Sequence, residues 1–381
     1  MSAIQTAIVV GFVGMLGAAL RADEPTPERS SERAAPAREQ PASADFKPIL
    51  DRLQAQDRRL DELQRNLAAL TKLLSESNGP QSAIRQTRQG EPTFRPLYTI
   101  DRDGSDLQFL WAAPGMITTG TPQWSHDGRM VAVDSMPRTD TVQESRIWIY
   151  GVAGPFKGAY RYLGAGNTPS WSPDDSQIAY FVNPQNPDGA RAGVWTMNAD
   201  GSGRKWWGEG WYPRWSPNGQ EICVHAHDTT PPSLRIFSVA SGELRSVLGD
   251  DIEVLFGGAT WSSDGKRLVT LIRRHGEQQL VTIDAQGDPA SIKVIYREPN
   301  VSQNLVGPPV MSPDAKQIVF GIQDLNLPDS GERRWMNTHL YLVASHGLTA
   351  PDLLEGKKIG KINRSMEWSP DSRRIIFSSE R

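Results

Sequence analysis

Two histidines, His225 and His227, have a type and spacing that could bind a metal ion. They lie in the segment EICVHAHD, and because side chains alternate across a strand, residues two apart share one face. Imidazole nitrogens placed in this way can ligate zinc or a similar cation. His275 is the candidate third ligand. These three histidines are the metal candidates, and the sequence indicates no catalytic residue and no cofactor.

Other chemistry-bearing groups are few. The single cysteine, Cys223, excludes an intrachain disulfide, and its place in an apolar strand predicts a buried, inert thiol. The sequence lacks the Gly-x-Ser-x-Gly element of α/β-hydrolases. It also lacks the Ser-x-Asp-x-Gly box of sialidases, because here Gly directly follows Asp. A net charge of −3 argues against a nucleic-acid partner. Binding is therefore favoured over catalysis.

A repeated unit positions the histidines, and its clearest copy spans residues 170–203. Trp171 opens the unit and begins a strand, residues 172–175 (SPDD) turn the chain, and residues 177–182 return as a second strand. A third strand at residues 194–197, an Asp-Gly hairpin turn and a fourth strand follow.

The same unit occurs six times, with openings 44 to 57 residues apart. The opening residues are Trp124, Trp171, Trp215, Trp261, Met311 and Trp368. One four-stranded unit per 40–50 residues is the period of a β-propeller, and we expect the opening tryptophans to pack between blades. The sequence thus predicts an all-β, six-bladed propeller over residues 95–381.

The last copy has room for only two strands after Trp368. The missing pair is predicted at the other end of the propeller, where residues 97–105 (LYTIDRDGS) match residues 194–202 (VWTMNADGS). The sixth blade is therefore expected to be shared by the two ends of the domain. Such closure removes open sheet edges.

The repeat, WSPDG followed by a hydrophobic strand and a MNADGSG-type segment, resembles the TolB-type propeller repeat, also called the WD40-like or PD40 repeat. This resemblance implies an envelope protein-binding role. The chain departs from TolB-type proteins before residue 95, where those proteins carry an α/β domain. The histidines are similar to those of oligogalacturonate-lyase-type propellers, which bind a metal in the channel, although only two occupy matched positions. The likeness to prolyl-oligopeptidase propellers stops at the repeat.

Polar residues mark the ends of the six second strands. Ten and twelve positions after each opening residue, the apolar pattern gives way to side chains of different chemistry in each blade. Propeller binding sites form where such strand ends and their loops converge. The predicted partner-binding residues are Asp134, Asn183, His225, His227, Arg273, Gln323 and Glu380.

Four segments precede the propeller. Residues 1–22 are predicted to be a cleaved secretory signal, or alternatively an uncleaved membrane anchor. Residues 23–44 are expected to be a disordered linker, and residues 79–94 a second linker. Residues 45–78 predict a helix with Leu53, Leu60 and Leu67 among its heptad positions, which favours a homo-oligomeric coiled coil. The alternative is a helix lying on the propeller flank.

The leading functional hypothesis is an exported, non-catalytic scaffold in a bacterial periplasm or envelope. It would bind a protein or an envelope polymer and would be oligomerised by residues 45–78. One alternative is a carbohydrate-active lyase or hydrolase with a channel metal site. Another is a sensor or structural ectodomain held by an uncleaved anchor.

Overall fold

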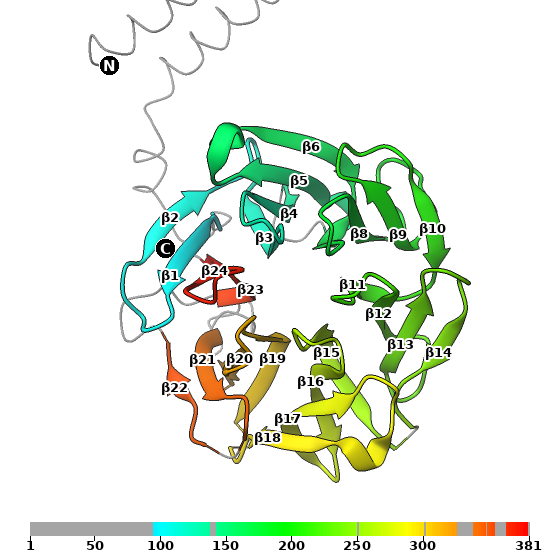
Figure 1. The fold of residues 1–381 in the computed structure, drawn as a ribbon, viewed down its shortest axis with the longest axis vertical. Helices are drawn as coiled ribbons and strands as arrows, with labels where there is room; N and C mark the ends of the chain where they lie inside the picture. Colours follow the sequence, from blue (N-terminus) through cyan, green and yellow to red (C-terminus); the bar gives the residue numbers. More distant parts are fainter. Residues whose placement is uncertain are drawn as a thin grey trace, which may run out of the picture. The chain divides into compact units, whose positions relative to one another are not determined.

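The computed structural model describes residues 94–137, 142–249, 251–300, 302–325, 338–347, 349–354 and 363–379. These residues form six four-stranded antiparallel sheets arranged around a common centre, as expected for a six-bladed propeller (Figure 1). The inner strand of each sheet packs against the inner strands of the two neighbouring sheets, so that the six blades close into a ring.

Each blade contributes one strand to each of four concentric positions (Figure 1). The inner strands are β3 (Thr118–Trp124), β7 (Asn167–Trp171), β11 (Trp211–Trp215), β15 (Glu253–Trp261), β19 (Gln303–Met311) and β23 (Asn363–Trp368). The second strands are β4 (Met130–Met136), β8 (Gln177–Val182), β12 (Glu221–Ala226), β16 (Arg267–Arg274), β20 (Gln317–Asp324) and β24 (Arg374–Ser379). The third strands are β5 (Arg146–Gly151), β9 (Gly193–Asn198), β13 (Ser233–Ser238), β17 (Glu277–Asp284), β21 (Thr338–Ala344) and β1 (Leu97–Asp101). The outer strands are β6 (Tyr160–Ala165), β10 (Lys205–Gly208), β14 (Leu244–Ser246), β18 (Lys293–Arg297), β22 (Asp352–Leu353) and β2 (Gln108–Trp111). The short 3-10 helices are η1 (Val142–Glu144), η2 (Gly154–Phe156) and η3 (Pro289–Ser291).

The sixth blade combines strands from both ends of the domain. Its order is β2-β1-β24-β23, and Leu97 of β1 pairs with Ser378 of β24. Blades 1 to 5 begin at β3, β7, β11, β15 and β19 and follow the chain in order.

The opening residues end their strands instead of beginning them, which corrects the sequence-based placement. Trp171, for example, is the last residue of β7. Its indole N–H donates to the carbonyl of Gln123 in blade 1, at 3.2 Å. Trp261 and Trp368 repeat this contact to the preceding blade. These tryptophans therefore join neighbouring blades, as expected.

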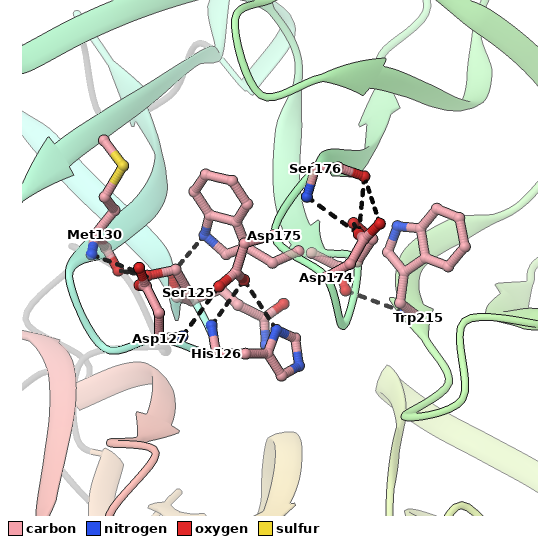
Figure 2. Close-up of polar contacts among 12 residues, drawn as sticks. Ser125, His126, Asp127, Met130, Asp174, Asp175, Ser176 and Trp215 are labelled. Atoms are coloured by element: carbon pink, nitrogen blue, oxygen red, sulfur yellow. Dashed lines mark hydrogen bonds and ion pairs between the residues drawn. The ribbon is translucent and has the colours of Figure 1, made fainter.

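The turn after each opening residue is closed by the same pair of serine contacts in all six blades, with Asn218 in place of the aspartate in blade 3. In blade 5 the hydroxyl of Ser312 donates to Asp314 at 2.6 Å and accepts the backbone N–H of Gln317 at 3.0 Å. The turn of blade 2 also reaches its neighbour, because Asp175 accepts the backbone N–H groups of His126 and Asp127 in blade 1 (Figure 2). The Ser-x-Asp pattern is thus explained by turn closure.

The remaining predictions on the N-terminal part, including the coiled-coil helix at residues 45–78, lie outside the described residues. Within the described residues, no helix is long and apolar enough to cross a membrane.

Candidate functional site

A bulge in every inner strand shapes the face of the ring opposite the Ser-x-Asp turns. We call this side the strand-end face; it carries the N-terminal ends of the inner strands and the C-terminal ends of the second strands. Each inner strand shifts register against its second strand, for instance between Trp211 and Arg214. Three residues before the opening, the backbone φ is positive at Thr121, Thr168, Tyr212, Gly258 and Ser365. Bulges re-aim side chains, so this repeated feature governs which groups reach the ring centre.

A polar chain crosses the ring centre from residues that stand directly before three of the openings. Arg214 of blade 3 donates to the side-chain oxygen of Gln123 in blade 1 at 2.8 Å. Gln123 in turn donates to Glu367 of blade 6 at 2.9 Å. Arg214 also donates to the backbone carbonyl of Pro169 in blade 2, at 3.3 Å. The buried guanidinium of Arg214 therefore joins blade 3 to blades 1 and 2, and Gln123 extends the link to blade 6.

Burial dominates the electrostatics of this chain. Arg214 is 6% exposed, and this desolvation lowers its pKa, while the nearby Glu367 opposes the shift. The guanidinium nevertheless stays charged. Glu367 is partly exposed toward the ring axis, yet the surrounding protein desolvates its carboxyl group and raises its pKa, with Arg214 opposing. Asp134 is buried beside them, and desolvation raises its pKa as well. One cation thus faces two desolvated acids.

An aromatic cluster lies next to this chain on the strand-end face, formed by Trp211, Tyr212, His227 and Phe256. Trp211 and His227 have ring centres 4.7 Å apart, and Tyr212 meets Phe256 edge-on at 5.2 Å. Phe256 is 60% exposed, the highest value among the large hydrophobic side chains of the described residues. A bulge between Val254 and Ala259 turns Phe256 outward. The cluster is an apolar, partly exposed surface held by ring contacts.

Two of the three candidate metal ligands, in β12 and its loop, belong to this region, but they differ in burial. His225 is 1% exposed, and its ring centre lies 4.0 Å from that of His227, which is exposed. Desolvation, with a smaller contribution from His227, lowers the pKa of His225 to about 3. The backbone of Val254 opposes this lowering of the His225 pKa. Within the described residues, neither ring nitrogen of His225 has a partner in hydrogen-bond geometry. Desolvation also lowers the pKa of His227. Both imidazoles are therefore neutral at pH 7.

The third candidate ligand does not complete a metal site. His275 lies in the exposed turn between β16 and β17, with a positive φ. In the described part of the chain, no group of three or more His, Cys, Asp or Glu side chains could hold a metal ion.

The other predicted binding residues are mostly buried. Asp134 is 7% exposed and accepts the backbone N–H of Thr168, so it caps the bulge of the next blade. Asn183 is 6% exposed and donates to the carbonyl of Val142, which ties η1 to blade 2.

Gln323 and Arg273 both lie near the ends of second strands, but they differ in solvent exposure. Gln323 is 9% exposed, whereas the Arg273 side chain is 41% exposed and pairs with Glu253 at 2.8 Å. Glu380 lies outside the described residues. Among the predicted partner-binding residues that the structure describes, His227 and Arg273 are thus the ones accessible to solvent.

Sequence reasoning missed the polar chain and the aromatic cluster. The residues directly before the openings are Gln123, Ser170, Arg214, Thr260, Val310 and Glu367. The chemistry of these side chains differs from blade to blade, and this variation could have indicated a functional surface at the ring centre. The aromatic cluster had a weaker signal, because Phe256 reaches it only through the β15 bulge.

The sequence matches no protein-family model and no curated protein. Solved structures do match. A putative TolB from Agrobacterium tumefaciens superposes with a TM-score of 0.59 at 17% identity, covering 77% of this chain and 99% of that chain. The protein has a TolB-like propeller fold. TolB from Acinetobacter baumannii superposes with a TM-score of 0.48 at 14% identity, covering 76% of this chain and 64% of that chain. An oligogalacturonate lyase in complex with manganese gives 0.44 at 16% identity, over 66% and 71% of the two chains. At these identities the TolB-like likeness concerns the fold, and function must be argued from the site.

Proposed function

We propose that this TolB-like propeller is an exported, non-catalytic scaffold that binds a protein or an envelope polymer through its strand-end face. The observation that carries the proposal is Phe256, an aromatic side chain 60% exposed and fixed by edge-on contact with Tyr212. A preformed aromatic surface loses little side-chain entropy on binding, and aromatic residues dominate interface hot spots. Of the residues predicted from the sequence, His227 belongs to this surface and Arg273 would border it.

Electrostatics support an apolar contact at the cluster. The neutral His227 ring adds no charge at pH 7, and Arg273 is already paired with Glu253. A partner that covers Phe256 and Trp211 would therefore desolvate no unpaired charge from these side chains. The long loops that the sequence places between the second and third strands of blades 1, 2 and 5 could add area toward the ~800 Å² per partner of a stable complex.

Site-specific photo-crosslinking tests the proposal. Replacing Phe256 by p-benzoylphenylalanine should capture a defined partner from the native envelope. The same replacement at Phe109, an exposed aromatic on β2 that is 52% accessible, serves as the matched control. Adding Trp211→Ala should abolish the adduct at position 256. Equal capture at both positions, or capture insensitive to Trp211→Ala, would contradict a site at the aromatic cluster.

Export and assembly rest on the sequence. The uncharged residues 3–20, within the predicted signal at residues 1–22, support export, with the uncleaved anchor as the alternative. The heptad pattern of residues 45–78 supports a homo-oligomer. The lyase alternative depends on His225, His227 and His275, and among the described residues no group of three or more His, Cys, Asp or Glu side chains could hold a metal ion.

A further inference from the structure

The longest stretch of the sequence without an acidic residue lies between Glu144 and Asp174. This stretch includes β5, η2 and β6, the outer half of blade 1, and its charged residues are Arg146, Lys157 and Arg161. β6 is the edge strand of its sheet and lies on the outer rim of the ring (Figure 1). One part of the rim is therefore formed by a segment that carries cations and no carboxylate.

Three large apolar side chains are exposed in this segment. Phe156 is 50%, Tyr160 is 52% and Tyr162 is 46% exposed. Lys157 and Arg161 are exposed beside them, so apolar and basic groups alternate along the chain. We call these five residues the edge patch. Aromatic rings interleaved with Lys and Arg are typical of surfaces that lie at a membrane interface, where cations meet lipid phosphates and amphipathic rings lie among the headgroups.

The cations around β6 are not used in ion pairs. Among the described residues, no carboxylate lies within ion-pair distance of Lys157, Arg161 or Arg204. Arg204 reaches β6 from blade 2 and donates to the carbonyl of Leu163. Elsewhere in the propeller exposed cations do pair, as Arg235 does with a carboxylate of its own blade. The rim of blade 1 therefore offers unpaired positive charge to an anionic surface.

Two carboxylates of blade 2 lie near this rim, and both are engaged within the fold. Asp188 accepts a backbone N–H of β6 at 3.1 Å. Burial raises the pKa of Tyr162, and Asp188 adds to this effect. Asp200 accepts the hydroxyl and the N–H of Ser202, contacts that lower its pKa, and Arg161 contributes to the same lowering. These two acids are outnumbered by four cations, Arg146, Lys157, Arg161 and Arg204.

The rings of blade 1 leave no slot for a ligand between them. Tyr160 and Tyr162 lie on one face of the sheet, where both contact Trp148 with ring centres 6.1 and 5.3 Å away. Trp111 of blade 6 contacts the Tyr160 ring as well, at 6.0 Å. A peptide or a sugar inserted between these described rings would have to displace contacts that the fold already makes.

The cation between the two tyrosines points to the other side of the sheet. Arg161 pairs with Ile149, so its side chain lies on the face opposite to Tyr160 and Tyr162. A ligand seated on one sheet face cannot contact both kinds of group. A flat surface that meets β6 edge-on can do so, because an edge strand presents both of its faces at the rim. Phe156 lies in η2, directly before β6, and extends the same edge.

We propose that the edge patch of blade 1 binds the surface of a membrane that contains anionic phospholipids. The rings of Phe156, Tyr160 and Tyr162 lie among the headgroups, and Lys157 and Arg161 contact lipid phosphates. This site lies on the outer rim and is separate from the aromatic cluster of the strand-end face, so either one can fail without the other.

A fluorescent reporter on the full chain tests this inference. Ala159 is exposed within the segment, and Ala159→Cys labelled with an NBD fluorophore leaves the edge patch intact. Cys223 is buried, so labelling is confined to the new thiol. The emission should shift to shorter wavelength with vesicles of phosphatidylcholine and phosphatidylglycerol, and not with phosphatidylcholine alone. The matched control is Ser246→Cys, an exposed position on the outer strand of blade 3, which should shift with neither.

Variants in the labelled background separate the contributions of charge and of the rings. Lys157→Glu/Arg161→Glu should weaken vesicle binding, read at position 159, by about tenfold or more. The matched control Lys266→Glu/Lys293→Glu reverses two exposed lysines of blade 4 and should change it less than about twofold. Phe156→Ser should weaken binding by about threefold or more, because it removes one ring from the interface. Circular dichroism confirms that the variants are folded.

Three results would overturn the inference. The first is absence of an emission shift at position 159, or an equal shift at position 246. The second is a shift that Lys157→Glu/Arg161→Glu leaves unchanged, or that pure phosphatidylcholine produces equally. The third is an equal shift with glycerol phosphate or polygalacturonate in place of vesicles, which would assign the patch to a free anion or to an acidic glycan. A vesicle contact made elsewhere in the chain leaves the emission at position 159 unchanged and so counts as the first result.

Discussion

Ser312→Ala tests whether the repeated turn, and not only apolar packing, stabilises each blade. Ser312 is fully buried, its hydroxyl donates to Asp314 at 2.6 Å, and it accepts the N–H of Gln317 at 3.0 Å. Alanine removes both contacts and leaves a backbone donor without its partner. An unsatisfied buried donor costs roughly 1–3 kcal/mol, and the lost hydrogen bond to a half-exposed carboxylate adds about 1 kcal/mol. We therefore expect a loss of about 2–4 kcal/mol.

Thermal and urea denaturation at pH 7 measure this loss. For a domain of this size, 1 kcal/mol corresponds to roughly 2–4 °C, so Tm should fall by about 4–16 °C. Ser202→Ala is the matched control, because Ser202 makes the same hydroxyl–carboxylate contact to Asp200 at 2.6 Å in an exposed hairpin. Water replaces that contact, so the control should lose much less stability. Equal losses for the two variants, or a Ser312→Ala loss below about 0.5 kcal/mol, would refute the reasoning.

Three further predictions concern closure, pH and assembly. Deleting residues 97–111 removes β1 and β2 and leaves β24 without its neighbour, so the Tm should fall and the chain should become sensitive to protease. A deletion variant that melts like the parent would refute closure through a shared blade. The folded-state pKa values of Asp134 and Glu367 are raised, so these groups add stability as the pH falls from neutral toward their ordinary pKa values of 3.8 and 4.5. The pKa of Asp314 is lowered by Ser312, so its contribution to stability is lost below pH 3.8. Tm should therefore rise as the pH falls from neutral toward 4.5 and should fall below 3.8. Glu367→Gln should remove part of the rise, and an unchanged rise would contradict this assignment. Leu60→Lys/Leu67→Lys should convert an oligomer of the mature protein into monomers in light scattering, and a monomeric parent would remove the coiled-coil hypothesis.

The fold could be predicted because each blade repeats the same local chemistry. The Ser-x-Asp turn recurs at five of the six openings, with Asn218 in place of Asp in blade 3, and the match between residues 97–105 and 194–202 located the outer strands of blade 6. The error in placing Trp171 had a physical cause. The tryptophan marks the blade clearly, but nothing local shows that its strand lies before the turn, since the preceding residues Asn167 to Ser170 are polar or proline.

The candidate site could be predicted only in part, because burial depends on the neighbouring blade. Asn183 looked like a polar strand end, yet η1 of blade 1 covers it and accepts its amide hydrogen bond. Asp134 is likewise enclosed by the bulge at Thr168. His227 and Arg273 remained accessible, but the exposed ring beside them, Phe256, depends on a bulge that the alternation of residues in β15 does not reveal.

The shared sixth blade has a consequence for the order in which the molecule can form. β1 is synthesised before blades 1 to 5, whereas its partner β24 follows all of them. Five sheets can therefore assemble from sequence-local hairpins while β1 and β2 wait as an isolated two-stranded ribbon, a structure that is marginal in water. Joining distant segments carries a loop-closure cost and slows folding. We expect ring closure to be the last and slowest step, and the ribosome-bound chain to expose the edges of β1 until β24 emerges.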